Sequence, residues 1–301
     1  MAEPAADAEP GAGTGSGGEA GTGAGAANGA GSGGAGTLGG VSPPAAAAPK
    51  DLRGRDAGVK APPVDIHPPT RLERWTYGAL RLLGFGLAKI WLRVEVHGTR
   101  NVPAHGPFVL APVHRSNVDF LLASFVVRRR MRYMGKASIW KWSAPGRFFS
   151  MLGAFPVHRG SADRDALRTC IRVMENGEPL VMFPEGTRRS GPRVHELFDG
   201  AAYVAARTGV PLVPVGIGGS EEAMPHGAKF IKPHKVVLVV GEPIEVPRGD
   251  GTGRVPRRVV RELTEQLHGA IQACFDEARR RAGLPVAGDA SNAADAGDTP
   301  T

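Results

Sequence analysis

Short apolar runs alternate with longer amphipathic segments through most of the chain. Runs bounded by Gly or Pro predict strands, and segments in which apolar residues recur every three or four positions predict helices. We therefore expect strands at residues 94–96, 108–113, 132–135, 154–157, 180–183, 212–217 and 236–240, and helices at residues 118–127, 139–152, 162–175, 198–206 and 255–282. This alternation predicts an α/β fold, a single domain with a mixed, mainly parallel sheet covered by helices.

The segment before the first strand, residues 71–94, has the period of one long amphipathic helix. Its basic side chains fall within roughly 120° of arc opposite the apolar stripe, and this much charge argues against a transmembrane span. Such a helix suits the headgroup boundary of an anionic membrane, and the alternative is a surface helix packed on its own domain. The apolar stripe comprises Leu72, Leu80, Leu83, Leu87, Ile90 and Val94. The basic face comprises Arg71, Arg74, Arg81, Lys89 and Arg93, and the helix also carries the aromatic residues Trp75, Tyr77 and Trp91.

The two ends of the chain differ in composition from the middle. Residues 1–66 consist mainly of Gly, Ala, Pro and Ser, and residues 284–301 are small and polar. Neither end can bury enough apolar surface to offset the entropy lost on ordering, so both are expected to be disordered tails. The predicted domain therefore spans residues 67–283, with the amphipathic helix at its start.

Charge is concentrated in this predicted domain. The first 66 residues carry four basic and seven acidic side chains and the last 18 carry three acidic ones, which leaves 33 basic and 19 acidic side chains, a net charge of +14, in between. A domain this basic is expected to bind polyanions, phosphorylated metabolites or an anionic membrane surface. The only cysteines, Cys170 and Cys274, fall on apolar stripes of predicted helices and no signal peptide is recognised, so a reduced, cytoplasmic setting is expected.

His114 and Asp119 are the first candidates for chemistry. His114 follows the predicted strand at 108–113, and the carboxyl ends of strands are where open α/β sheets place their ligands. A tight loop into the next helix would fold the Asp119 carboxylate back onto the imidazole. This contact would hold one tautomer and leave the other ring nitrogen free to accept a proton from a hydroxyl.

A purely structural role for the same loop is the alternative. Ser116 and Asp119 also have the spacing of a capping box, in which their side chains would satisfy the first amides of the following helix.

Two arginines also come directly after predicted strands. Arg159 follows residues 153–158, and Arg188 follows residues 181–187, in which Pro184 ends the strand and Gly186 turns the chain. In a parallel sheet both loops emerge on the edge that carries His114. Paired guanidinium groups at that edge would suit a phosphate, although an arginine taken singly is more often a solvated loop residue.

These segments together resemble the four sequence blocks of the glycerolipid acyltransferases, most closely the bacterial 1-acyl-sn-glycerol-3-phosphate acyltransferases. The order and spacing match across most of residues 67–283, with Pro156 and His158 as departures that leave the acceptor less determined than the chemistry. The resemblance implies that His114 is the general base and Asp119 its orienting acid. It implies further that the acceptor is bound by Arg159, Glu185, Gly186, Thr187 and Arg188, and that the acyl region is lined by Pro211 and Pro214.

The reaction that the resemblance implies is transfer of a fatty acyl group from acyl-CoA or acyl carrier protein to the free hydroxyl of 1-acyl-sn-glycerol 3-phosphate, which makes phosphatidic acid. No cofactor and no metal are expected, because the thiolate is a good leaving group. No Ser or Cys nucleophile lies in a recognisable elbow, so direct transfer is expected. The implied location is the cytoplasmic face of the membrane, as a peripheral protein.

Two other interpretations remain open at this point. The acceptor could be another lysophospholipid, glycerol 3-phosphate or a glycolipid. Alternatively, the domain could be a basic module that binds membrane or nucleic acid through the arginine runs at 128–130 and 279–281, although both runs also fit helix-end charges.

Overall fold

The computed structural model describes residues 70–157, 164–247 and 254–287. Of the two predicted tails, residues 1–66 and 288–301 lie outside this range. The described strands form one sheet in the order β1-β7-β6-β2-β5-β3-β4, in which only β6 and β7 pair antiparallel. The mixed, mainly parallel sheet is therefore confirmed. The strands are β1 (Glu95–His97), β2 (Val109–Pro112), β3 (Arg132–Lys136), β4 (Ala154–Val157), β5 (Leu180–Val181), β6 (Leu212–Gly218) and β7 (Val237–Val240).

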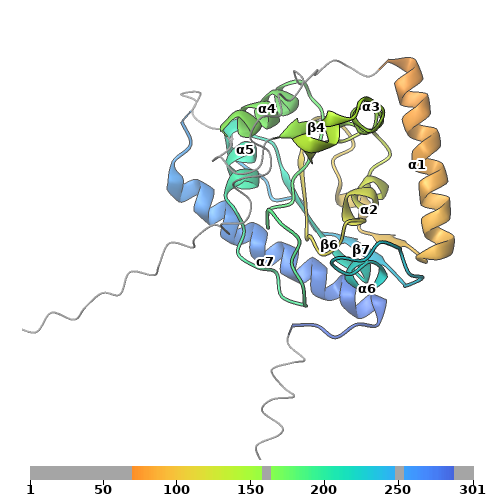
Figure 1. Cartoon of the computed structure of the whole chain (residues 1–301). Helices are drawn as coiled ribbons and strands as arrows, with labels where there is room; N and C mark the ends of the chain where they lie inside the picture. The colour runs from red at the N-terminus through yellow and green to blue at the C-terminus, as the bar shows by residue number, and fades with distance from the viewer. Residues whose placement is uncertain (1–69, 158–163, 248–253, 288–301) are drawn as a thin grey trace, which may run out of the picture. The chain divides into compact units, whose positions relative to one another are not determined.

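Helices cover both faces of the sheet (Figure 1). From β2 the chain moves across the sheet to β3 and β4 at one edge, and it then returns across the sheet through β5 to β6 on the far side of β2. Right-handed crossovers therefore place α2 and α3 on one face and α4 and α5, joined by α7, on the opposite face. The α-helices are α1 (Arg71–Trp91), α2 (Asp119–Val126), α3 (Ser143–Met151), α4 (Arg164–Glu175), α5 (Gly200–Thr208), α6 (Ser220–Ala223) and α7 (Arg257–Ala282).

The helix predicted at residues 139–152 is divided in two. A 3₁₀ helix spans Ala137–Lys141, Trp142 is extended, and α3 begins at Ser143. Pro145 explains the break, because in a continuous helix its ring would clash with the carbonyl of residue 141, whereas it is tolerated in the first turn of α3. The short helix α6 was not predicted, since four residues carry no readable period.

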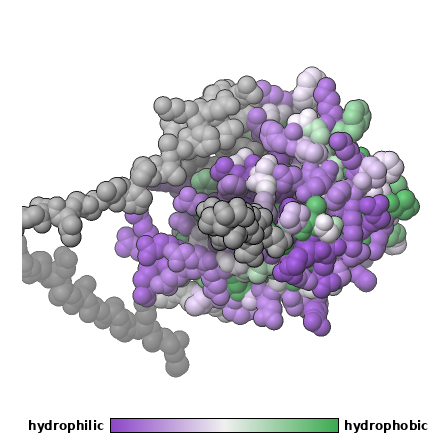
Figure 2. Space-filling model, turned by 90° about the horizontal axis from the view of Figure 1, so that it is seen from below, coloured by the Kyte–Doolittle hydropathy of each residue, from purple (hydrophilic) through white to green (hydrophobic). Residues whose placement is uncertain are grey.

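The apolar stripe of α1 faces away from the sheet. Leu72, Leu83, Leu87 and Ile90 are between 58% and 79% exposed. The helix packs on α2 through its other side, where Phe85 meets the ring of Phe125 with centroids 5.1 Å apart. Seen from below, the surface is mostly polar, and apolar side chains gather on the side where α1 lies (Figure 2). Most of the apolar stripe is therefore exposed, although Val94 at its end is buried. Because α1 also packs on α2, both the membrane contact and the surface helix packed on its own domain stay predictions.

One residue of the predicted basic face of α1 has a different role. Arg81 turns toward the sheet, where its Nε donates to the carbonyl of Ser124 at 2.9 Å. Its terminal Nη2 donates to the carbonyl of Phe125 at 3.1 Å. These are carbonyls of the last turn of α2, so Arg81 caps that helix. Arg71, Arg74, Lys89 and Arg93 remain on the exposed surface. No helix in the described part of the chain is long and apolar enough to cross a membrane.

The longest helix, α7, lies directly on the backbone of β6. A Cβ on Gly216 would lie 2.2 Å from the carbonyl carbon and oxygen of Cys274, and one on Gly218 would lie 2.5 Å from those of Ala278. Glycine is therefore required at these strand positions by the close approach of the helix. Both cysteines are buried on their helices, as predicted.

We expect Gly216→Ala to destabilise the protein, because α7 would have to move away from β6. Overpacking of this kind costs about 1–3 kcal/mol of the free energy of unfolding. The matched control is Gly269→Ala on the exposed side of α7, where a Cβ would meet nothing within 4 Å. That change should stabilise the helix by about 0.5–1 kcal/mol. Urea denaturation measures both variants, and equal stabilities would contradict the packing argument.

Candidate active site

His114 and Asp119 meet as predicted, at the carboxyl end of β2. The His114 Nδ1 and the Asp119 Oδ2 are 3.0 Å apart, and the aspartate is fully buried while the imidazole keeps 18% of its side chain exposed. An ionised carboxylate only accepts, so Nδ1 carries the proton and Nε2 is left free to act as a base. The Phe183 ring stacks on the imidazole with centroids 4.2 Å apart, which further restricts its orientation.

The same carboxylate oxygen also closes the loop between β2 and α2. Asp119 Oδ2 accepts from the backbone N–H of Arg115 at 2.6 Å and from that of Ser116 at 2.7 Å. The alternative capping role is therefore also met in part, because the Ser116 Oγ accepts from the backbone N–H of Val118 at 3.5 Å, although the helix proper begins after Val118, which has no side-chain cap. The Ser116 hydroxyl also donates to the carbonyl of Met224, just after α6, at 2.8 Å. Loop closure and imidazole orientation are thus two effects of one aspartate.

Glu185 lies beneath this loop. Its oxygens accept from the backbone N–H of His114 at 2.9 Å and that of His195 at 3.0 Å, and from the Arg115 guanidinium at 2.8 and 3.0 Å. The carboxylate is fully buried. An acceptor could therefore reach Glu185 only after these bonds break, and in this structure the residue holds two loops together.

Arg115 was not singled out from the sequence, yet it is the centre of the site's hydrogen bonding. It is 1% exposed, it lies over the Phe275 ring of α7, and it donates to the carbonyls of His114, Gly191 and Arg193 in addition to Glu185. The only sequence signal was an arginine beside the candidate base and a glutamate in a distant block. A buried arginine needs a carboxylate, but spacing alone does not say which one.

The other residues of the third block lie on the turn after β5. Gly186 has a φ of +66°, and a Cβ there would lie 2.6 Å from the Phe198 ring, so only glycine fits. Thr187 is half-buried beside it. Arg188 is half-buried, and no carboxylate in the described ranges forms a salt bridge with it. The next residue, Arg189, donates its backbone N–H to the carbonyl of His114 at 2.9 Å, which ties this turn to the histidine loop.

The remaining predicted residues are less informative. Arg159 lies outside the described residues, so its convergence with Arg188 stays a prediction. Pro211 accepts a backbone hydrogen bond from Val109 at 3.0 Å, and Pro214 is buried in β6 opposite Ala111. Their observed contacts are with the sheet, and their proposed place beside an acyl chain is untested. Across residues 70–157, 164–247 and 254–287, no group of three or more His, Cys, Asp and Glu side chains could hold a metal ion.

The two arginine runs are largely used within the fold. Arg129 donates to the carbonyls of Pro103 and Gly106 and lies over the Phe108 ring. Arg130 donates to the carbonyl of Ser150, and Arg279 to that of Pro285. The last two, Arg280 and Arg281, pair with Glu277 of the same helix. Few of these guanidinium groups are left for a polyanion, which weakens the binding-module interpretation.

Known proteins are similar to this chain in sequence and in fold. The family model described as Acyltransferase matches residues 93–218, which run from before β1 to the end of β6 and include the His114 and Glu185 loops. The 1-acyl-sn-glycerol-3-phosphate acyltransferase of Bacillus subtilis is 32% identical over 180 residues, which are 60% of this chain and 86% of that protein. The chain belongs to this acyltransferase family.

Two further relatives extend the comparison. A chloroplastic 1-acyl-sn-glycerol-3-phosphate acyltransferase of Brassica napus is 28% identical over 176 residues, covering 54% of this chain and 51% of that protein. The chain thus spans about half the length of that chloroplastic relative. The crystal structure of the 1-acyl-sn-glycerophosphate acyltransferase PlsC from Thermotoga maritima superposes with a TM-score of 0.55 at 25% identity, over 67% of this chain and 79% of that one. The α/β fold of this acyltransferase-family chain is therefore that of its solved relative.

We expect the buried pair to show strong coupling in stability. Arg115→Met would leave the Glu185 carboxylate buried without its cation, which costs about 3–5 kcal/mol of the free energy of unfolding. The double variant Arg115→Met/Glu185→Gln should lose less than the sum of the two single variants.

Urea denaturation of all three variants measures this coupling. The control is Arg168→Met, which breaks the exposed pair with Asp165 and should change stability by less than about 1 kcal/mol. An Arg115→Met variant as stable as Arg168→Met would contradict the account of the buried pair.

Proposed function

We propose that this chain is an O-acyltransferase that transfers a fatty acyl group from an acyl thioester to the free hydroxyl of 1-acyl-sn-glycerol 3-phosphate. The product would be phosphatidic acid, a precursor in phospholipid synthesis. The observation that carries the proposal is the His114–Asp119 pair, 3.0 Å apart at the carboxyl end of β2, with the free imidazole nitrogen unblocked. The Bacillus subtilis relative, a 1-acyl-sn-glycerol-3-phosphate acyltransferase, supports the same reaction.

The proposed mechanism uses His114 as a general base. Its Nε2 takes the proton of the acceptor hydroxyl while that oxygen attacks the thioester carbonyl, and Asp119 stabilises the imidazolium that forms. The tetrahedral intermediate then collapses, the C–S bond breaks, and the imidazolium returns the proton to the leaving thiolate. The co-substrate is acyl-CoA or acyl carrier protein, which leaves as the free thiol, and no step of this proposed reaction uses a cofactor or a metal.

Direct transfer, without an acyl-enzyme, fits the cysteines of the chain. Both thiols are buried, and burial raises the pKa of the Cys274 thiol to about 11, so it stays protonated at neutral pH. A protonated, inaccessible thiol is a poor nucleophile. The hydroxyl of the acceptor is then the group that attacks the thioester.

The acceptor's phosphate is proposed to bind at the turn after β5. Arg188 carries a half-buried guanidinium there, without a salt bridge to any described carboxylate, on a turn joined to the histidine loop through Arg189. A phosphate would supply the missing charge. Arg159 is proposed as the second cation. Another lysophospholipid, glycerol 3-phosphate or a glycolipid is the competing acceptor.

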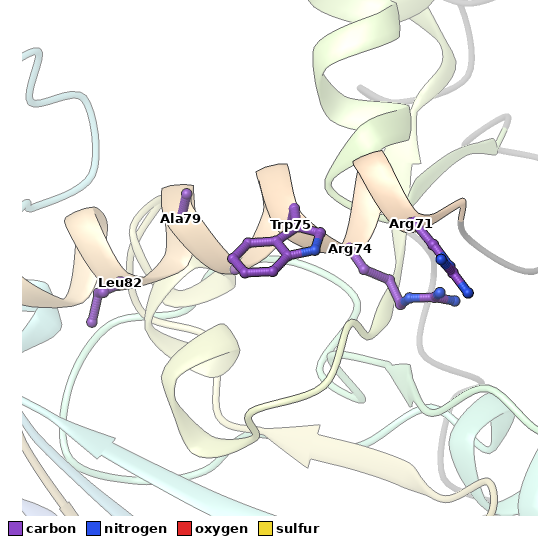
Figure 3. A pocket seen from close by; sticks show the side chains of 6 residues that line it. Arg71, Arg74, Trp75, Ala79 and Leu82 are labelled. Carbon is purple, nitrogen blue, oxygen red and sulfur yellow. The ribbon is translucent and has the colours of Figure 1, made fainter.

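We also propose that the protein is peripheral on an anionic membrane, at the cytoplasmic face, with α1 as the contact. The exposed apolar stripe and the exposed basic residues of the same helix fit the headgroup boundary. A groove of about 690 Å³ follows one flank of α1 and is lined by Arg71, Arg74, Trp75, Gly78, Ala79 and Leu82. Arg71 and Arg74 extend the same way from the helix, with the Trp75 ring beside them (Figure 3). This arrangement suits a lipid headgroup.

The first test concerns the base. His114→Ala should lower kcat by about 10²–10⁴-fold, because general base catalysis contributes that much, and should leave the fold intact. Asp119→Asn should change the rate in the same direction. Release of free CoA from acyl-CoA in the presence of lysolipid measures turnover.

The matched control is His97→Ala in β1, which is far along the sheet from β2 in strand order and should keep the wild-type rate. Near-normal turnover by purified, folded His114→Ala would remove the proposed mechanism.

The second test concerns the phosphate. If Arg188 binds it, the enzyme should prefer lysophosphatidic acid to a monoacylglycerol that lacks only the phosphate by at least about tenfold in kcat/KM, since a hydrogen bond to a charged group contributes about 1.5–3 kcal/mol. Arg188→Ala should harm only the phosphorylated acceptor, whereas Arg261→Ala on α7 should harm neither. Equal use of both acceptors by the wild type would favour the glycolipid alternative.

A further inference from the structure

The segment between α6 and β7 presents a second exposed apolar site. Phe230 is 82% exposed and Ile231 38% exposed, and the lysines on either side, Lys229 and Lys232, are also exposed. We call residues 229–232 the KFIK loop. The whole connection from residue 224 to residue 236 contains no Asp or Glu. Two adjacent exposed apolar side chains between two lysines suggest a partner that is both apolar and anionic, once they are shown to continue a larger apolar surface.

The KFIK loop is held in a defined conformation. The Lys232 backbone N–H donates to the carbonyl of Ala223 at 2.8 Å, which ties the loop to the end of α6. The Trp91 indole N–H donates to the carbonyl of Ile231 at 3.0 Å, and the Val236 N–H to the carbonyl of Leu92 at 2.9 Å. The loop is therefore fastened to the last turn of α1, beside which it lies in Figure 1.

This attachment makes the KFIK loop continuous with the exposed face of α1. Ile90 and Trp91, at the end of that face, are 79% and 52% exposed, and Trp91 is the residue that bonds to the loop. Lys235 is not part of the same surface, because its ammonium pairs with Glu95 at 3.0 Å. Two lysines and one aromatic ring thus extend the α1 surface sideways, from a segment about 140 residues further along the chain.

We propose that the KFIK loop is a second contact with an anionic lipid surface, in which Phe230 enters the headgroup region and Lys229 and Lys232 bind lipid phosphates. The proposal rests on the proposed membrane contact of α1 and extends it. Charge complementarity and continuity with the α1 face favour lipid over a protein partner, since the two elements form one surface of apolar side chains with basic residues beside them. Two contacts far apart in sequence would fix the rotation of the protein about the axis of α1, which one helix alone leaves free.

The contact is also connected to the catalytic loop. The residue that follows α6, Met224, accepts the hydroxyl of Ser116, and Ser116 is in turn held by Asp119. The KFIK loop and the loop that carries His114 are therefore linked by hydrogen bonds at the end of α6. Docking through residues 229–232 would set the direction from which a lysolipid reaches His114.

The experiment measures vesicle sedimentation of the full chain, with phosphatidylcholine vesicles that contain phosphatidylglycerol and with phosphatidylcholine alone. Lys229→Glu/Lys232→Glu should weaken binding to the anionic vesicles at least about twenty-five-fold, since each basic residue near the surface contributes about fivefold. The matched control is Arg258→Glu/Arg261→Glu, near the start of α7. It changes the net charge by the same amount and should bind anionic vesicles almost as the wild type does.

Insertion of the aromatic ring is tested separately. Both native cysteines are buried, so Phe230→Cys can be labelled selectively with a polarity-sensitive fluorophore. Its emission should shift to the blue on anionic vesicles, whereas the same label at Gly269→Cys on α7 should not respond. Phe230→Ser should weaken binding, and Phe230→Leu should retain most of it.

Three results would overturn the proposal. They are wild-type binding by the double lysine variant, a label at position 230 that stays in water on vesicles, and loss of binding only in an α1 variant such as Arg71→Glu/Lys89→Glu. Sedimentation does not depend on turnover, so failure of the proposed acyltransferase reaction and failure of this contact are separate results. Turnover on a soluble short-chain acyl-CoA should be unchanged in the KFIK variants, because none of these residues touches the His114 loop.

Discussion

The buried ion pair between Arg115 and Glu185 is the constraint on which the site depends. Neither charge could remain in the interior alone. Glu185 also accepts from the backbone N–H groups of His114 and His195, and Arg115 also donates to the carbonyls of Gly191 and Arg193. The pair therefore joins the loop of the base, the turn that carries Arg188 and the surface of α7 through Phe275. His114, the proposed base, is held in place by an electrostatic contact that lies below its loop.

A second constraint is the close packing of α7 on β6, which Gly216 and Gly218 permit. Because α7 sits directly on the strand, its Phe275 ring reaches Arg115, and Gln272 accepts from the backbone of Val194 at 2.7 Å in the loop after Glu185. The helix on the far face of the sheet thus supports the site at the strand ends. Catalytic geometry and core packing are consequently difficult to alter separately.

The proposed membrane contact and the proposed catalytic pair are connected through α6 and the two loops beside it. The exposed face of α1, the proposed lipid loop and the Ser116–Met224 hydrogen bond lie along one path to the base. If the protein takes a lysolipid from a bilayer as proposed, His114 has to be oriented relative to that surface. The end of α6, where Ala223 bonds to the lipid loop and Met224 to the histidine loop, would provide this orientation without a flexible linker.

The sequence by itself determined the alternation of strands and helices, the His114–Asp119 pair and the burial of both cysteines. These follow from local period and from a five-residue spacing, which a strand-to-helix loop can close in few ways. It also determined that α1 is amphipathic, but only the tertiary structure showed that the apolar stripe points outward and that Arg81 caps α2. Glu185 shows the same limit. Its position in a motif predicts that the residue matters, but the motif does not give its partners. These are Arg115 and the backbone amides of His114 and His195, which lie up to 71 residues away in the sequence. Only folding brings those partners together, because burial and pairing are properties of long-range contacts.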